Sequence, residues 1–309
     1  MPAGPDQPRV EVPALLRRTV STWEGAAGRA WLDALPGAAA EFAERWGLTI
    51  ERVLVPGGQV SLVLLVRTDE GEPATLKLGL VTAESEREPE ALERWDGLGA
   101  VRLLRAEPER GAMLLERLSG DVSLRSLPEA KAMLEAAGTL RRLWVPVPED
   151  HPFTTQHAHV TRLLRLLRER RDRPGVEEIR PLADEAIAAA ESLLADPPEQ
   201  VLLHGDFHHG NVLAGERLPW LAIDPKPLVG ERAYDLAWLV RDRLDTLAGQ
   251  PGPAAATRRR LTRLADSLEV DPDRLRGWSL FRAVEAGVWA VTVGDPALGR
   301  LLLEFASWL

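Results

Sequence analysis

Hydrophobic residues recur at helical spacing up to residue 46, and the pattern then changes to short β-rich runs. Apolar positions three or four residues apart between 14 and 46 predict two amphipathic helices, with a break near Pro36 and Gly37. Beyond residue 48, apolar runs bounded by turn residues predict antiparallel strands, with one helix over 84–97 between the third and fourth. The five predicted strands are 48–56, 59–67, 74–80, 101–107 and 112–118.

Beyond Leu118 the pattern becomes mainly helical. The predicted helices are 128–144, 157–172, 181–195, 233–248, 256–268, 273–291 and 297–308. A β-rich interlude at 201–224 interrupts them, and the Pro/Gly/Ala stretch 249–256 predicts a surface loop. The change of pattern predicts an α+β protein of two domains, 1–118 and 119–309.

Composition narrows the function classes. The chain has 309 residues, about twice the usual domain length of roughly 150, and its net charge of -9 argues against nucleic-acid binding. The absence of cysteine excludes disulfides and zinc-thiolate sites. The start has no leader-like apolar segment, and no apolar run reaches the ~20 residues that span a bilayer, so we expect no membrane contact and a cytoplasmic location.

The interlude VLLHGDFHHGNVLAGERLPWLAIDP carries the candidate chemistry. Short apolar runs flank two polar clusters, which places the polar groups at strand ends. Asn211 follows Asp206 by five positions, and Asp224 closes the next apolar run. Phosphoryl transfer from ATP needs a carboxylate beside the acceptor hydroxyl and oxygen ligands that hold Mg²⁺ on the phosphates. These three side chains can supply both.

The segments HGDFHHGN and AIDPKPLVGERAYDLAWL resemble the aminoglycoside phosphotransferase family, in particular its streptomycin 6-phosphotransferase and hydroxyurea kinase branch. LERWDGLGAVRLL, MLLERL and RLRGWSLFRAVEAGVW are similar to that branch too, so the resemblance extends from about residue 12 to near the end of the chain. It implies a two-lobed protein-kinase-like fold, with a five-stranded antiparallel N-lobe and a mainly helical C-lobe. It also implies ATP and Mg²⁺ as cofactors, a small-molecule acceptor, and a role in antibiotic resistance.

The resemblance assigns roles to individual residues. Asp206 would be the catalytic aspartate, and Asn211 and Asp224 would ligate Mg²⁺. In the N-lobe, Lys77 would contact the phosphates and Glu88 would pair with it. The remaining implied roles are adenine binding by the backbone of Glu116 to Leu118, phosphate contact by the loop with Gly57, Gly58 and Ser61, and support of the catalytic loop by His204 and Asp235.

The residues themselves support part of this assignment. Only three of the 38 basic residues are lysines, namely Lys77, Lys131 and Lys226, and Lys77 lies in an apolar strand, where an ammonium needs an anionic partner. Pro89 disfavours helical geometry at Glu88, which leaves Glu86 as the alternative partner. A strand lysine can also extend to the sheet edge, and two glycines between strands can form an ordinary hairpin.

Other functions remain open at this point. The spacing of His204, His208 and His209 would permit zinc binding, and Gly-Asp-Phe-His shares the Gly-Asp-x-His motif of two-metal phosphoesterases. No histidine follows residue 209, which disfavours such an enzyme. A kinase of an endogenous metabolite and a non-catalytic nucleotide-binding protein are further alternatives.

The acceptor is the least determined part of the site. Lys226 could reach a phosphate or pair with Glu231, and Trp289 and Glu285 could line an acceptor pocket by analogy with the family. A basic aminoglycoside would require acidic residues near Asp206. Candidates are Glu231, Asp235 and Glu285.

Overall fold

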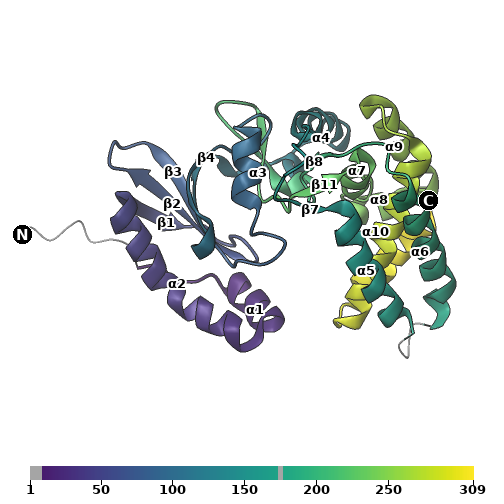
Figure 1. Cartoon of the computed structure of the whole chain (residues 1–309), viewed down its shortest axis with the longest axis horizontal. Helices are drawn as coiled ribbons and strands as arrows, with labels where there is room; N and C mark the ends of the chain where they lie inside the picture. Colours follow the sequence, from purple (N-terminus) through teal and green to yellow (C-terminus); the bar gives the residue numbers. More distant parts are fainter. Residues whose placement is uncertain (1–8, 173–176) are drawn as a thin grey trace, which may run out of the picture. The chain divides into compact units, whose positions relative to one another are not determined.

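The computed structural model of the chain describes residues 9–172 and 177–309. The first eight residues, which belong to the start of the chain where no leader segment was expected, lie outside these ranges. The described chain divides into two compact units, which Figure 1 shows with their helices and strands labelled. Unit 1 is the chain up to Gly120 together with Ala214–Leu221, and unit 2 consists of Asp121–Leu213 and Ala222–Leu309. The prediction of functional domains at 1–118 and 119–309 stays a prediction.

The core element of unit 1 is a five-stranded antiparallel sheet of order β1-β2-β3-β5-β4. Its strands are β1 (Leu48–Val53), β2 (Ser61–Thr68), β3 (Pro73–Gly79), β4 (Leu103–Glu107) and β5 (Ala112–Glu116). The three helices of this unit are α1 (Ala14–Trp23), α2 (Gly25–Trp46) and α3 (Glu88–Trp95). The five predicted strands are thereby confirmed, with ends shifted by a few residues.

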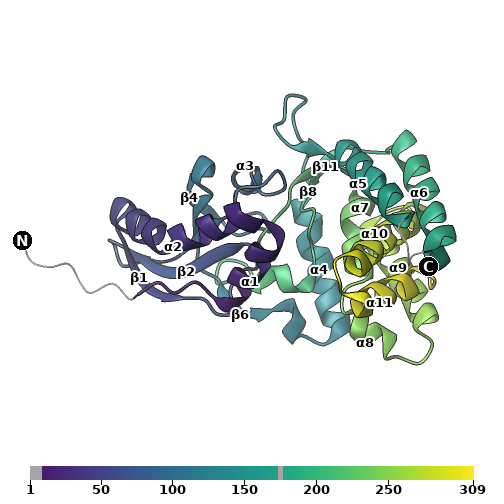
Figure 2. The ribbon, with the colours of Figure 1, turned by 90° about the horizontal axis from the view of Figure 1, so that it is seen from below.

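One face of this sheet forms the core of unit 1 with α1 and α2. Leu16 and Leu35 from the helices pack with Leu62, Leu76 and Leu78 from the strands, and all five are buried. Figure 2 shows α2 lying along β1 and β2. Because side chains alternate along a strand, Lys77 lies between Leu76 and Leu78 in sequence but faces the opposite side of the sheet.

The predicted helix break near Pro36 is wrong. The chain breaks at Glu24, between α1 and α2, and α2 continues through Pro36. Gly25 has a φ of 57°, a left-handed conformation that suits glycine at the joint. Buried residues lie on both sides of Pro36, including Leu32 and Phe42, and their packing outweighs the hydrogen bond that proline cannot donate.

Unit 2 is mainly helical and is organised around α10 (Pro272–Thr292), which packs on α5, α6, α7, α9 and α11. Figure 1 shows α5, α6 and α10 running side by side. The other helices are α4 (Glu129–Leu143), α5 (Gln156–Arg171), α6 (Arg180–Ala195), α7 (Arg232–Val240), α8 (Leu244–Ala248), α9 (Pro253–Leu268) and α11 (Pro296–Ala306). No helix within the described ranges is both long and apolar enough to span a bilayer.

Short strands complete the structure. They are β6 (Ser119–Ser123), β7 (Thr154–Thr155), β8 (Val201–Leu203), β9 (Val212–Ala214), β10 (Trp220–Ala222) and β11 (Leu228–Gly230). They form two three-stranded sheets, β10-β9-β6 and β7-β11-β8.

Two of the predicted helix boundaries need correction. The helix predicted over 233–248 is divided into α7 and α8 at Arg243, which has a φ of 54°, and α9 begins at Pro253, inside the predicted loop.

Candidate functional site

The face of β3 that is turned away from α1 and α2 carries a buried ion pair in unit 1. Lys77 Nζ donates to both carboxylate oxygens of Glu88, at 2.7 Å each. The side chains are only 10% and 4% exposed. A pair so far from water persists only when its geometry is good, because each charge alone would carry a desolvation cost of several kcal/mol.

The structure identifies Glu88 as the partner, although Pro89 made Glu86 the alternative. Glu88 is the first residue of α3, and Pro89 occupies the first helical turn, where the missing N–H is not needed by the helix. The carboxylate of Glu88 therefore faces the sheet, whereas the Glu86 side chain is half-exposed. The first turn of a helix also favours a carboxylate through the helix dipole.

The predicted phosphate loop connects β1 to β2. Gly57 has a φ of 69°, and a Cβ there would meet the Leu54 carbonyl oxygen at 2.7 Å, so this turn requires glycine. Gly58 packs on Ser61, which begins β2 and is buried. The loop is therefore a tight connection in which position 57 must be glycine.

The segment predicted to hold adenine lies at the end of β5. The Glu116 carboxylate accepts a hydrogen bond from the backbone N–H of Arg102 at 2.7 Å and pairs with Arg217 at 2.6 Å. Leu118 lies just beyond the strand and packs beside Gly215. Arg217 also donates to the carbonyl oxygen of Gly97, so residues 214–221 are fastened to unit 1 at this point.

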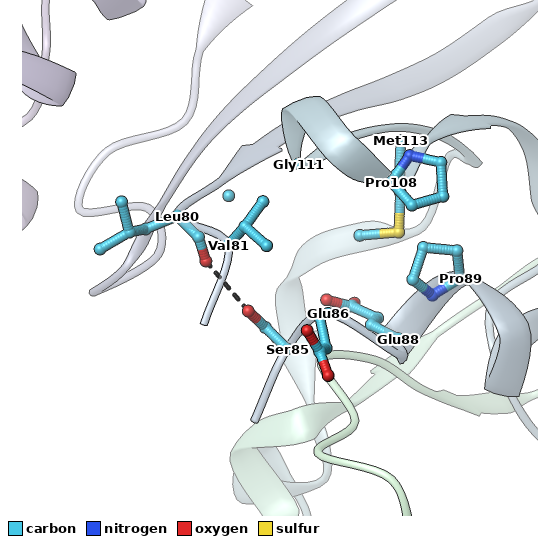
Figure 3. A pocket seen from close by; sticks show the side chains of 10 residues that line it. Leu80, Val81, Ser85, Glu86, Glu88, Pro89, Pro108, Gly111 and Met113 are labelled. Carbon is cyan, nitrogen blue, oxygen red and sulfur yellow. Dashed lines mark hydrogen bonds between the residues drawn. The ribbon is translucent and has the colours of Figure 1, made fainter. Parts of the chain in front are cut away.

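A small hollow in unit 1 opens beside the ion pair (Figure 3). Its lining comes from the end of β3, the start of α3 and the turn before β5, and includes Glu88 and Met113. Figure 3 shows Met113, Pro89 and Pro108 together on one side, and Leu80 with Val81 on the other. The hollow therefore presents mostly apolar atoms beside the Glu88 carboxylate.

In unit 2, the loop after β8 is held by Asp235 of α7. Its Oδ2 accepts the backbone N–H of His204 at 2.9 Å and the indole N–H of Trp144 at 3.1 Å, and its Oδ1 accepts the N–H of Gly205 at 2.9 Å. Asp235 is fully buried. A buried carboxylate with three donors fixes the loop backbone just before Asp206.

Further hydrogen bonds bring Asp206, Asn211 and Asp224 together. The Asn211 side-chain N–H donates to the Asp206 carbonyl oxygen at 3.0 Å, and the backbone N–H of Ile223 donates to the Asn211 carbonyl oxygen at 2.9 Å. Asp224 follows directly, with a φ of 60° that costs a non-glycine residue of order 1–3 kcal/mol. Strain of this kind is typical of functional sites.

The donor set of these residues fits a magnesium ion. Asn211 uses its amide nitrogen within the loop, so its side-chain oxygen could serve as a ligand atom, and Asp224 would contribute a carboxylate. Mg²⁺ prefers oxygen ligands and binds through one or two carboxylates together with phosphate oxygens.

Lys226 forms an ion pair with Asp206, with Nζ and Oδ2 2.9 Å apart. Burial opposes ionisation of the Asp206 carboxyl, but the Lys226 ammonium together with His208 and His204 holds the pKa of Asp206 below its usual value. Of the two roles considered for Lys226, contact with a phosphate or pairing with Glu231, the contacts do not favour the second, since Lys226 pairs with Asp206. The Glu231 carboxylate is buried and accepts hydrogen bonds from Arg274 and from the indole N–H of Trp278 at 2.7 Å.

Each histidine of the loop has its own partner. The His204 ring is buried, which lowers its pKa, and its Nε2 lies 3.1 Å from the Ile223 carbonyl oxygen. His208 Nδ1 accepts the Gly210 N–H at 3.0 Å, and His209 Nδ1 lies 2.9 Å from Asp242 Oδ2. These rings therefore brace the loop.

Of the residues predicted to contact the acceptor, Glu285 and Trp289 lie on α10. Glu285 is half-buried and forms an ion pair with Arg170, at 3.5 Å. Burial raises the pKa of Glu285, and Trp289 follows one helical turn later. Two buried arginines near Asp206, Arg241 and Arg282, were missed. Arg282 could have been found by the signal that identified Lys77, because it lies within the apolar run SLFRAV.

Comparison with known proteins decides the family. Residues 45–294 match the model of the family described as aminoglycoside/hydroxyurea antibiotic resistance kinase. The chain belongs to this family. Streptomycin 6-kinase of Streptomyces glaucescens is 37% identical over 307 residues, with 97% of both chains covered. Hydroxyurea phosphotransferase of Kitasatospora aureofaciens is 40% identical over 304 residues, which cover 94% of this chain and 83% of that protein.

The fold agrees with the family. The crystal structure of aminoglycoside phosphotransferase APH(4)-Ia superposes with a TM-score of 0.60 at 16% identity, and covers 88% of this chain and 98% of that one. The predicted protein-kinase-like fold class is therefore confirmed. The chain itself has a strand lysine paired with a helix glutamate, and hydrogen bonds that connect Asp206, Asn211 and Ile223, the residue before Asp224.

Proposed function

We propose that this chain is an ATP- and Mg²⁺-dependent kinase that phosphorylates a hydroxyl group of a small molecule of the streptomycin or hydroxyurea kind, and that it confers resistance to the compound it modifies. The hydrogen bonds that connect Asp206, Asn211 and Ile223 carry this proposal, because they gather a catalytic carboxylate and two oxygen ligands in one loop system. The 37–40% identity to a streptomycin kinase and a hydroxyurea kinase supports the acceptor class.

Each residue has a defined part in the reaction. Asp206 accepts the proton of the acceptor hydroxyl while the hydroxyl oxygen forms a bond to the γ-phosphorus of ATP. The bond from that phosphorus to the bridging oxygen of the β-phosphate breaks, and ADP leaves. Bound Mg²⁺ neutralises the phosphate charges. Asn211 and Asp224 would hold it, and Lys77, oriented by Glu88, would contact the α- and β-phosphates.

Lys226 has a second role in this proposal. Its ammonium keeps Asp206 ionised, so the carboxylate is ready to accept a proton. The same ammonium can move to the γ-phosphate when nucleotide binds, because a lysine side chain is long and flexible. His204 and Asp235 would act as positioning residues that fix the backbone on which Asp206 lies.

The test is ADP release with hydroxyurea and with streptomycin as acceptors, for the wild type and for Asp206→Asn. Loss of a general base costs about 10²- to 10⁴-fold in rate, whereas binding of Mg²⁺ and a non-hydrolysable ATP analogue should persist in the variant. Asp150→Asn, at an exposed position of unit 2, is the matched control and should retain full turnover.

Two results would contradict the proposal. Turnover by Asp206→Asn at the wild-type rate would remove Asp206 from its role. Nucleotide binding that does not depend on Mg²⁺, without turnover of any acceptor, would indicate a non-catalytic nucleotide-binding protein.

A further inference from the structure

A second buried carboxylate in unit 2 holds the loop of residues 204–211. Asp242 lies just beyond the end of α7, and its side chain is only 4% exposed. Its Oδ2 accepts the backbone N–H of His209 at 2.6 Å and lies 2.9 Å from the ring nitrogen Nδ1 of the same residue, which is fully buried. Asp242 therefore binds the loop after Asp206, whereas Asp235 binds it before Asp206.

The two oxygens of Asp242 have different partners. Oδ1 accepts the backbone N–H of the next residue, Arg243, at 2.8 Å, which is a local bond of the turn after α7. Oδ2 binds residue 209, which is 33 positions away in sequence. Burial opposes ionisation of the Asp242 carboxyl, but its contacts with His209, together with His208, hold its pKa below the usual value. The acceptor is thus a carboxylate, and hydrogen bonds to a charged acceptor are the stronger ones.

Arg243 strengthens this attachment from a backbone conformation that is unfavourable for arginine. Its φ of 54° lies in the left-handed region. Its guanidinium donates to the carbonyl oxygens of Leu124 and Leu127 at 2.7 Å and 3.0 Å, and its Nε lies 3.2 Å from Nδ1 of His209. A strained residue persists only where the surrounding contacts impose its conformation, and such residues are common at functional sites. The turn after α7 therefore directs two consecutive side chains to His209.

His209 begins a short 3₁₀ turn that ends at Asn211. Within this turn, the backbone N–H of Gly210 donates to the His208 ring at 3.0 Å, and the backbone N–H of Asn211 donates to the His208 carbonyl oxygen at 2.9 Å. The first N–H of the turn is the one that Asp242 accepts. Because only one residue separates His209 from Asn211, a displacement of His209 moves the side chain that would bind Mg²⁺.

Both carboxylates belong to one stretch of chain. Asp235 lies in the first turn of α7, and Asp242 follows seven residues later, which is about two helical turns. Asp235 accepts the N–H groups of His204 and Gly205, and Asp242 accepts that of His209. α7 and the turn that ends it thus hold the loop at two separate points, one next to Asp206 and one next to the turn that carries Asn211.

We propose that Asp242, supported by Arg243, is a positioning residue for Asn211, and that it controls Mg²⁺ binding separately from the positioning of Asp206 by Asp235. This inference rests on the proposed function, because that function makes Asn211 a ligand of Mg²⁺ and Asp206 the base. Loss of Asp242 weakens Mg²⁺ binding more than proton transfer, and loss of Asp235 has the opposite effect. A contribution to stability alone would not produce this difference.

The experiment measures the affinity for a non-hydrolysable ATP analogue by calorimetric titration, with and without Mg²⁺, and the ratio of the two affinities is the Mg²⁺ effect. Both oxygens of Asp242 accept backbone N–H groups, so the NH₂ group of Asp242→Asn must face one of these donors. The Mg²⁺ effect should fall by about 10- to 100-fold, as on loss of a residue that supports a metal ligand.

Asp235→Asn is the comparison variant. Both oxygens of Asp235 also accept backbone N–H groups, so the substitution disturbs the loop in the same way at its other attachment. This variant should retain most of the Mg²⁺ effect. Its kcat at saturating Mg²⁺, measured with whichever of hydroxyurea and streptomycin the wild type phosphorylates, should fall by roughly 10²-fold, as expected for a displaced catalytic group.

Two controls and a second variant complete the design. Asp245→Asn, at an exposed aspartate three residues beyond Asp242, should leave the Mg²⁺ effect and kcat at wild-type values. Arg274→Gln breaks the ion pair with buried Glu231, and it should lower the unfolding temperature without changing the Mg²⁺ effect. Arg243→Gly removes the side chain at a φ that glycine adopts without strain, so it should lower the Mg²⁺ effect even where Asp242→Asn does not fold.

The outcomes separate this inference from the proposed function. A Mg²⁺ effect of wild-type size in both Asp242→Asn and Arg243→Gly would overturn the inference, while Asp206-dependent turnover would uphold the kinase. Equal losses of the Mg²⁺ effect in Asp242→Asn and Asp235→Asn would also overturn it, because the two carboxylates would then not act on separate parts of the loop. An analogue that binds the wild type equally well without Mg²⁺ would contradict the proposed function and the inference together.

Discussion

Gly205 lies directly before Asp206 in a conformation that only glycine adopts without strain. Its φ is 78°, and a Cβ at this position would overlap the Lys226 carbonyl oxygen. Gly205→Ala should therefore destabilise the protein by more than the roughly 1–2 kcal/mol of the backbone conformation alone. It should also displace Asp206, and a shift of about 1 Å can lower the rate by roughly 10²-fold. Steady-state kinetics and urea unfolding measure the two effects.

Gly138 provides the opposite case. It lies on the exposed side of α4, and a Cβ there would meet no atom within 4 Å. Gly138→Ala should raise stability by roughly 0.5–1 kcal/mol, because alanine favours the helix, and it should leave turnover unchanged. Equal effects of the two alanines would show that the Gly205 conformation is not required.

Lys226 controls the charge of Asp206, so its removal should change the pH dependence of the reaction. The Lys226 ammonium lowers the pKa of Asp206, so Lys226→Met should raise that pKa. The base must be ionised to accept a proton, and the acidic limb of the kcat/KM profile should therefore move to higher pH. Lys131→Met, at an exposed lysine of α4, should leave the limb in place. An unmoved limb in Lys226→Met would separate Lys226 from the base.

The role of a single residue could be predicted where a local sequence pattern indicates it. Lys77 was found because an ammonium inside an apolar strand needs an anion, and the loop residues because the spacing from Asp206 to Asn211 is characteristic. The pairing of Lys226 with Asp206 was not predicted, because their contact depends on how two loops meet. The same holds for Arg241 and Arg282, whose stacking on Trp238 joins α7 to α10.

At the scale of elements, strands were predicted more reliably than helix ends. Alternation in β2 and β3 identifies their buried face locally, whereas a helix end depends on what the helix packs against. Pro36 shows this most clearly. The proline predicted a break, but the burial of Leu35 and Ala39 keeps α2 continuous.

Pro36 should therefore reduce the stability of α2. Pro36→Ala restores a helix hydrogen bond and removes a steric clash, and it should raise the free energy of unfolding by about 1–3 kcal/mol. Pro296, in the first turn of α11, is the matched control, because no hydrogen bond is lost there. Pro296→Ala should change stability little. Urea denaturation measures both, and an equal gain from the two substitutions would contradict this account.

At the scale of the molecule, the sequence pattern predicted a division near residue 118 but not the return of residues 214–221 to unit 1. Arg217 explains that return, because it bonds to Glu116, Gly97 and Ala100. Its contacts lie about a hundred residues away in sequence, and no local periodicity records them. Long-range polar contacts of this kind are the part of the fold that periodicity alone does not predict.

A histidine held neutral inside unit 2 should make the stability of the whole chain depend on pH. Burial, with Arg282, Arg162 and Lys226, lowers the pKa of His159 from 6.5 to about 3 in the folded protein. Between these values the unfolded chain binds a proton that the folded chain does not, so stability is retained above pH 6.5 and falls as the pH is lowered towards 3. The slope from this group is at most about 1.4 kcal/mol per pH unit.

Urea unfolding at pH 7.0, 6.0 and 5.0 tests this dependence. His159→Asn should lose less stability than the wild type over that range, because asparagine does not titrate. His157→Asn, at an exposed position on the same helix, should follow the wild-type slope. The pKa values of His204, which is buried, and of His208, which is half-buried, are also lowered by loss of solvation, so both leave a residual slope in every variant. An identical slope in His159→Asn and the wild type would show that His159 is not held neutral by burial and the neighbouring cations.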